Sequence, residues 1–184
     1  MGGPRGVRSL EESLRAHIRD IPDFPRPGIV FKDVTPLFAD ASTLKATVDA
    51  VTAHANAEGA QYVVSAEARG FALGGAVAAA AGAGFVFARK PGKLPRETLT
   101  VEYELEYGMD ALEVHTDAFP AGARVLVHDD LLATGGTAAA LCALVEQSGA
   151  VVAACSFVVE LAFLAGRERL AGREVRSLIS YDAQ

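Results

Sequence analysis

Two adjacent acids and a small, glycine-containing turn are the residues best suited to chemistry. Asp129 and Asp130 follow the apolar run 125–127, and the turn Thr-Gly-Gly-Thr at 134–137 leads into a segment with apolar residues at helical spacing. Free N–H groups at a helix N-terminus attract anions, and glycines let the backbone approach closely. Carboxylates beside such a turn can accept hydrogen bonds from sugar hydroxyls. The segment therefore predicts a site for a sugar phosphate such as ribose 5-phosphate.

A loop rich in cations follows another predicted strand, residues 85–88, and holds Arg89, Lys90, Lys93 and Arg96. The net charge of −6 argues against general affinity for nucleic acids, so a polyanionic ligand would need a local cationic cluster. Charge runs are often only solvated surface. This one leaves the carboxyl end of a strand, at the sheet edge where parallel sheets bind ligands. We therefore expect a second anion site beside the first.

The elements that must position these residues alternate along the chain. Helices are expected at 9–20, where Ser9 and Glu12 suggest a capping box, and at about 44–55. Predicted strands cover 62–65, 85–88, 124–128 and 151–159. A helix is expected between the first two strands and another between the last two. Alternating residues in 98–107 and 112–116 predict a β-ribbon with a mobile turn. We predict an α/β fold, a parallel β-sheet flanked by helices, with a projecting flexible β-ribbon.

Composition favours one soluble domain over the whole chain, 1–184. With 51% hydrophobic residues it can bury an ample core, and we expect residues 1–8 to be flexible. A small hood is expected from about 21–38, a Pro-rich region, together with the C-terminal strand 176–180. Residues 71–88 are uncharged but rich in alanine and glycine, which predicts a packed helix and a buried strand and no membrane span.

Cysteine and histidine usage points to a reducing compartment and to no metal cage. Cys142 and Cys155 are expected to be free buried thiols, and we see no signal peptide, so a cytoplasmic location is predicted. The four histidines lack ligand spacing and are interpreted as structural or surface residues. They are His17, His54, His115 and His128.

The acid pair and its turn, residues 129–137, resemble the signature for 5-phosphoribosyl 1-pyrophosphate (PRPP) of the type I phosphoribosyltransferases. The form of the signature is similar to that of family members that act on adenine. Further segments that resemble these enzymes, in the same order, are 22–33, 67–71, 89–95, 105–108 and 159–161. The resemblance covers roughly residues 10–181. It implies a Rossmann-like fold and transfer of the phosphoribosyl group from PRPP to adenine. The products would be AMP and pyrophosphate, in purine salvage, with Mg²⁺ carried by PRPP.

The resemblance also implies roles for individual residues. PRPP and AMP would be bound by Asp129, Asp130, Ala133, Thr134, Gly135, Gly136 and Thr137. Pyrophosphate would be bound by Arg69, Arg89, Lys90 and Lys93. Adenine would lie between Phe31 and Leu161, with backbone groups of Val30 and Arg69 at the purine edge. The residues expected to act in catalysis are Glu106, Tyr107 and Arg69.

The acid that handles the purine proton is expected in the ribbon. Related enzymes that act on 6-oxopurines often carry an acid in the PRPP loop, where this chain has Ala133. Glu106 lies at the Gly-flanked ribbon tip and could close over the site, where exclusion of water would strengthen its contact with the base. The alternative is a solvent-facing carboxylate beside Glu102 and Glu104.

Two other functions stay open from the sequence. The same transfer could use another purine base, xanthine or hypoxanthine, or the chain could be a non-catalytic PRPP-binding regulator. The regulator would be expected to lack the loop acid and to carry a DNA-binding element, whereas this chain has Glu106 and no basic helix-turn-helix. Expected partners are the small-molecule substrates and products and a second copy of the chain in a homodimer, with no nucleic acid and no membrane.

Overall fold

The structure is a computed structural model that describes residues 9–104 and 108–183. Contacts divide the chain into two compact units, one within residues 1–47 and one spanning 48–183. The first unit contains α1 (Leu10–Ala16), β1 (Arg19–Pro22), β2 (Val30–Asp33), α2 (Thr35–Ala39) and the start of α3 (Ala41–Ala57). Whether the whole chain acts as a single domain stays a prediction.

The predicted capping box is confirmed at the start of α1. The Ser9 hydroxyl accepts from the Glu12 N–H at 3.2 Å, and the Glu12 carboxylate accepts from the Ser9 N–H at 2.8 Å. The predicted helix end at residue 20 is wrong, because α1 stops at Ala16. Residues 19–22 instead pair antiparallel with β2, and this pairing places Lys32 Nζ 2.7 Å from an Asp20 oxygen.

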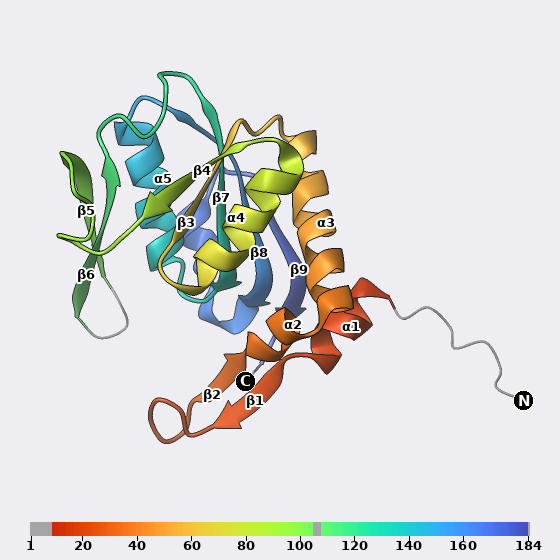
Figure 1. Cartoon of the computed structure of the whole chain (residues 1–184). Coiled ribbons are helices and arrows are strands. Elements are labelled where there is room, and N and C mark those ends of the chain that lie inside the picture. Colours follow the sequence, from red (N-terminus) through yellow and green to blue (C-terminus); the bar gives the residue numbers. More distant parts are fainter. Residues whose placement is uncertain (1–8, 105–107, 184) are drawn as a thin grey trace, which may run out of the picture. The chain divides into compact units, whose positions relative to one another are not determined.

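The second unit is built around a five-stranded parallel sheet (Figure 1). Its elements are β3 (Tyr62–Ala66), α4 (Arg69–Ala81), β4 (Gly84–Ala88), β5 (Thr98–Glu104), β6 (Met109–His115), β7 (Arg124–Leu132), α5 (Gly136–Gln147), β8 (Val151–Leu161), η1 (Ala162–Leu164), η2 (Gly166–Leu170) and β9 (Val175–Tyr181). The strand order is β4-β3-β7-β8-β9, and every neighbouring pair is parallel. The predicted α/β class, a parallel sheet flanked by helices, is confirmed.

Helices cover both faces of this sheet because successive strand residues point to opposite sides. Val63 and Leu126 pack with apolar residues of α3 and α4. Their neighbours Val64 and Val127 pack on the other side with α5 (Figure 1). Strands apolar on both faces are typical of parallel sheets.

Three expectations about the strands need correction. Residues 85–88 are not fully buried, because β4 is an edge strand and Phe87 is 51% exposed. The C-terminal strand, predicted to belong to the hood, is the other edge strand of the main sheet, since β9 pairs with the long β8. β7 extends to Leu132, so the two acids lie within the strand and not after it.

The predicted ribbon is confirmed in its two strands. β5 and β6 pair antiparallel from Thr98 opposite His115 to Glu104 opposite Met109. At its base, Glu113 and Arg89 exchange two backbone hydrogen bonds, of 2.9 and 2.7 Å, which fasten the ribbon to the loop after β4. The predicted turn at 105–107 lies outside the described residues. In the part of the chain that the structure describes, no helix is both long and apolar enough to cross a bilayer.

Candidate active site

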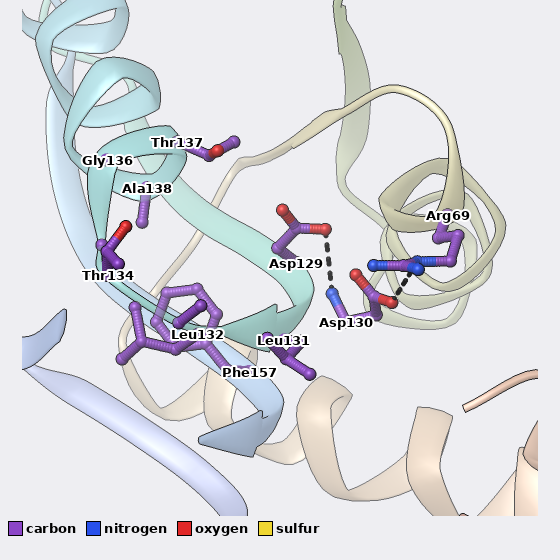
Figure 2. Close-up of a pocket in the computed structure, with 12 residues that line it drawn as sticks. Arg69, Asp129, Asp130, Leu131, Leu132, Thr134, Gly136, Thr137, Ala138 and Phe157 are labelled. Carbon is purple, nitrogen blue, oxygen red and sulfur yellow. Dashed lines mark hydrogen bonds and ion pairs between the residues drawn. The ribbon is translucent and has the colours of Figure 1, made fainter. Parts of the chain in front are cut away.

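Two adjoining cavities lie at the carboxyl ends of β3 and β7. The first encloses about 200 Å³ and is lined by Arg69, Asp129, Asp130, residues 131–138 and Phe157 (Figure 2). The second encloses about 420 Å³ and shares the arginine, both aspartates and Thr137 with the first. Its other walls come from Ala66, Glu67, Ala68, Lys90, Tyr103, Asp110 and Leu112. Because the two share four residues, one ligand could occupy both.

The first cavity is shaped to hold an anion. α5 begins at Gly136, so the first backbone N–H groups of the helix have no intrahelical acceptor. Gly135 precedes the helix with a φ of 81°, a conformation that favours glycine. The hydroxyl-bearing side chains of Thr134 and Thr137 lie near the start of α5 (Figure 2). All seven residues predicted to bind PRPP or AMP line this cavity: Asp129, Asp130, Ala133, Thr134, Gly135, Gly136 and Thr137.

The two aspartates differ in their surroundings. Asp130 is only 4% exposed, and one of its oxygens lies 2.7 Å from Arg69 Nε (Figure 2). Asp129 accepts a hydrogen bond of 2.9 Å from the Asp130 N–H. Burial, followed by the charge of Asp130, raises the pKa of Asp129 well above its usual value. The negative charge of Asp130 thus disfavours ionisation of Asp129, and a cation or a hydroxyl donor at the pair would offset this.

A loop at the end of β3 forms the floor of the second cavity. It contains a cis peptide between Glu67 and Ala68 and ends at Arg69, the first residue of α4. Glu67 accepts from the Lys90 N–H and from Arg89 Nε, both at 2.9 Å. These hydrogen bonds, the Lys90 N–H first, hold the pKa of Glu67 below its usual value despite partial burial. The loop is therefore tied to the cationic segment after β4.

The predicted pyrophosphate cations are only partly brought together. Arg69 and Lys90 line the second cavity. Arg89 turns to Glu67, and its Nη1 donates to the Lys93 carbonyl at 3.4 Å, while neither Arg89 nor Lys93 is among the cavity's lining residues. Arg96, the other cation of the loop, pairs with Asp117. Arg89 and Arg96 are thus paired with acids from other parts of the chain.

Sequence reasoning missed two residues of the ribbon. Tyr103 and Asp110 both line the second cavity. The alternating pattern could have placed them opposite each other, since hairpin register pairs them directly. It could not have placed them beside Lys90, because the link between the ribbon and the loop after β4 is a long-range bridge.

Three groups of predicted residues are not placed at these cavities. Glu106 and Tyr107 lie outside the described residues. Val30 and Phe31 belong to β2 of the first unit, where the Phe31 ring packs edge-on against Phe24 at 5.2 Å. Leu161 ends β8 in the second unit and is half-buried. The adenine subsite therefore stays a prediction.

Comparisons with known proteins agree with this geometry. No family model matches the chain. The chain is 58% identical to an adenine phosphoribosyltransferase of Rubrobacter xylanophilus, over 91% of each chain. It is 54% identical to one of Methylococcus capsulatus, over 92% of this chain and 99% of the relative.

Solved structures with the same fold carry the same name. Adenine phosphoribosyltransferase from Thermoanaerobacter pseudethanolicus superimposes with a TM-score of 0.90 at 47% identity, over 94% of this chain and 100% of the other. The enzyme from Saccharomyces cerevisiae, complexed with an imino-altritol bisphosphate and adenine, gives 0.88 at 40% identity with the same coverage. The chain therefore belongs to the adenine phosphoribosyltransferase family.

Proposed function

We propose that this protein transfers the 5-phosphoribosyl group of PRPP to adenine and releases AMP and pyrophosphate. The observation that carries the proposal is the pair of adjoining cavities, which suits a ligand with a phosphate at one end and a diphosphate at the other. Its relatives bear the name of this activity, and the yeast enzyme was captured with a bisphosphate and adenine.

Different residues would bind the phosphate, the ribose and the diphosphate of PRPP. The turn 134–137 and the start of α5 hold the 5′-phosphate through N–H groups and hydroxyls. Asp129 and Asp130 accept hydrogen bonds from the ribose hydroxyls, and Arg69 and Lys90 face the diphosphate. In the transfer, a purine nitrogen bonds to ribose C1 as the bond from C1 to the diphosphate oxygen breaks. Positive charge develops on the ribose, so fixed carboxylates nearby favour the transition state.

A divalent cation fits the charge of the second cavity. Two cations, Arg69 and Lys90, face four acidic residues there: Glu67, Asp110, Asp129 and Asp130. The side chains of this cavity therefore carry no net positive charge to balance a diphosphate. Burial and the charge of Asp130 raise the pKa of Asp129, so a cation near the two aspartates is favoured. Among residues 9–104 and 108–183, no group of three or more potential ligands forms a metal cage. We propose that Mg²⁺ enters with PRPP, carried by the ligand's own oxygens, where it would offset the charge of the leaving diphosphate. A chelator should abolish pyrophosphate release, and excess Mg²⁺ should restore it.

Glu106 is proposed as the group that handles the purine proton. It belongs to the connection between Glu104 and Met109, the last paired residues of the ribbon. Glu106→Gln should lower kcat by roughly 10²- to 10⁴-fold, the usual effect of losing a general acid or base, with less effect on PRPP binding. Glu102→Gln and Glu104→Gln are matched controls that remove the same charge from the ribbon. Equal losses in all three variants would point to general electrostatics and contradict this role.

The choice of base is tested by measuring pyrophosphate release from PRPP with one base at a time. With Mg²⁺ present, adenine should support turnover, while hypoxanthine, guanine, xanthine and uracil should be poor substrates. Turnover with xanthine or hypoxanthine above that with adenine would overturn the assignment of the base. Tight PRPP binding without release for any base would indicate a regulator.

A homodimer is proposed from the exposed edge of the sheet. Phe87 on β4 is half-exposed, and its ring lies 5.0 Å from that of Phe71 and 4.9 Å from that of Phe85. An aromatic patch on an open edge strand favours burial against another chain. Light scattering at micromolar concentration should give twice the monomer mass. A fully active monomer would contradict the proposal.

A cytoplasmic location is proposed from the thiols. Cys142 and Cys155 are buried and free, although their sulfur atoms lie only 3.6 Å apart. Free thiols at this separation suit a reducing compartment. Thiol titration of protein prepared from its native cells without reductant should find both free, and a disulfide would argue for another compartment.

A further inference from the structure

The ribbon contributes one wall of the cavity assigned to the diphosphate. Tyr103 on β5 and Asp110 on β6 lie directly opposite each other in the antiparallel register. Both line the second cavity together with Arg69, Lys90 and Thr137. Tyr103 has no role in the function described so far, and Asp110 has entered only the charge balance of the second cavity.

The Tyr103 hydroxyl is placed to donate into the cavity. Its ring is half-buried and packs against the main core, which fixes the position of the side chain. The hydroxyl lies 3.5 Å from an Asp110 oxygen, which is long for a bond between a hydroxyl and a carboxylate. Burial raises the pKa of Tyr103, so the group stays protonated. A loosely held donor can turn toward a phosphoryl oxygen at little cost.

Asp110 orients a cation toward the same space. Its Oδ1 accepts from the Ala111 N–H at 2.9 Å, which fixes the carboxylate. Its Oδ2 lies 3.1 Å from Lys90 Nζ, although the Lys90 side chain is 57% exposed. Burial alone would raise the pKa of Asp110, but the bonds from Ala111 and Lys90 keep it below its usual value. The carboxylate therefore stays charged and holds the ammonium group at the cavity.

We propose that the ribbon supplies two residues to the pyrophosphate site. Tyr103 donates a hydrogen bond to a diphosphate oxygen, and Asp110 is a positioning residue that holds Lys90 toward the same group. The inference rests on the proposed function, since it takes the occupant of the second cavity to be a diphosphate. The ribbon would thus contact the diphosphate directly through Tyr103 and act on it indirectly through Asp110 and Lys90.

Pyrophosphate binding tests Tyr103 directly. Calorimetric titration with pyrophosphate and Mg²⁺ should show a Kd roughly tenfold higher for Tyr103→Phe, the effect of one hydrogen bond to a charged group. The KM for PRPP should rise similarly, while the KM for adenine stays near that of the wild type. Tyr62→Phe is the matched control. Tyr62 is the first residue of β3, at the end of the strand away from the cavities, and its ring packs against Phe119. Wild-type affinity in Tyr103→Phe would overturn the contact.

Asp110 is tested through Lys90. Asp110→Asn should weaken pyrophosphate binding in the wild-type background and have no further effect in a Lys90→Met background, because its role acts through Lys90. If Asp110 only repels the diphosphate, Asp110→Asn would tighten binding in both backgrounds, which would overturn the positioning role. Equal weakening in both backgrounds would overturn it too.

The outcome is separable from that of the proposed function. Wild-type turnover with adenine decides the proposed function, whereas the titrations need no turnover. An inactive wild type that binds pyrophosphate through Tyr103 would reject the activity and keep the inference.

Discussion

Gly166 is the residue whose substitution most directly tests how the turn 133–136, proposed to bind the 5′-phosphate, is held in place. A Cβ added at Gly166 would lie 2.2 Å from the Ala133 carbonyl oxygen and 3.1 Å from the Gly135 nitrogen. Real Cβ atoms essentially never approach closer than 3.0 Å. The contacted atoms belong to the backbone, so no side chain can turn away to make room. Gly166→Ala must therefore move either the turn 133–136 or the start of η2.

The size of the displacement sets the expected effect. Relieving the contact requires a shift on the order of 1 Å, and a misplacement of that size can lower catalytic efficiency roughly 10²-fold. We expect Gly166→Ala to lower kcat/KM for PRPP by about that factor, with a smaller change for adenine. The variant touches no predicted ligand contact, so the loss would come from the position of the turn.

Steady-state kinetics and thermal unfolding, measured together, decide the outcome. Gly75→Ala is the matched control, because a Cβ at Gly75 meets nothing within 4 Å and lies inside α4. It should leave the kinetics unchanged and stabilise the helix by about 0.5–1 kcal/mol. A folded Gly166→Ala protein with the wild-type KM for PRPP would show that η2 gives way instead, and would refute the reasoning.

Three further predictions concern the turn 134–137, α4 and β7. Asp130→Asn and Thr134→Val should each raise the KM for PRPP while circular dichroism shows a folded protein, since one loses a charged acceptor and the other a donor. Normal saturation with PRPP in either variant would reject the assignment of the first cavity to the ribose phosphate. Gly74→Ala should lower the unfolding free energy by about 1–3 kcal/mol in urea titrations, because its Cβ would lie 2.2 Å from Ser65 Oγ. Burial lowers the pKa of His128 from 6.5 to about 4, so the unfolded state takes up a proton first as the pH falls. The free energy of unfolding should fall by about 2 kcal/mol as the pH is lowered from about 7.5 to about 5. This pH-dependent decrease should be absent in His128→Asn.

Local patterns were enough to predict the turn 134–137 and the elements on either side of it. Asp129 and Asp130, Gly135 and the apolar face of α5 are close in sequence, so strand, turn and helix could be predicted together, and all seven expected residues line one cavity. The capping box at Ser9 was equally local. Interactions within about a helical turn follow from residue types and spacing.

Long-range pairing explains what the sequence did not reveal. The place of β9 depends on β8 having a free edge, and the contact of Lys90 with Asp110 depends on the bridge between Arg89 and Glu113. The orientation of Arg89 toward Glu67 likewise joins two loops that are distant in sequence. Single-chain periodicity carries no information on which distant strands become neighbours, so these partners emerged only from the structure.

The order of the strands also bears on how the protein folds. The ribbon closes between Thr98 and His115, near neighbours in the chain, whereas β3 must find β7 with Tyr62 opposite Val125. Pairings between distant residues form slowly because a long loop must be closed first. The turn 134–137 comes close to the loop at Arg69 only after β3 and β7 have paired. We therefore expect PRPP to bind only once the sheet has formed. Stopped-flow experiments should then show that PRPP slows unfolding without accelerating refolding, and faster refolding would mean that the site assembles early.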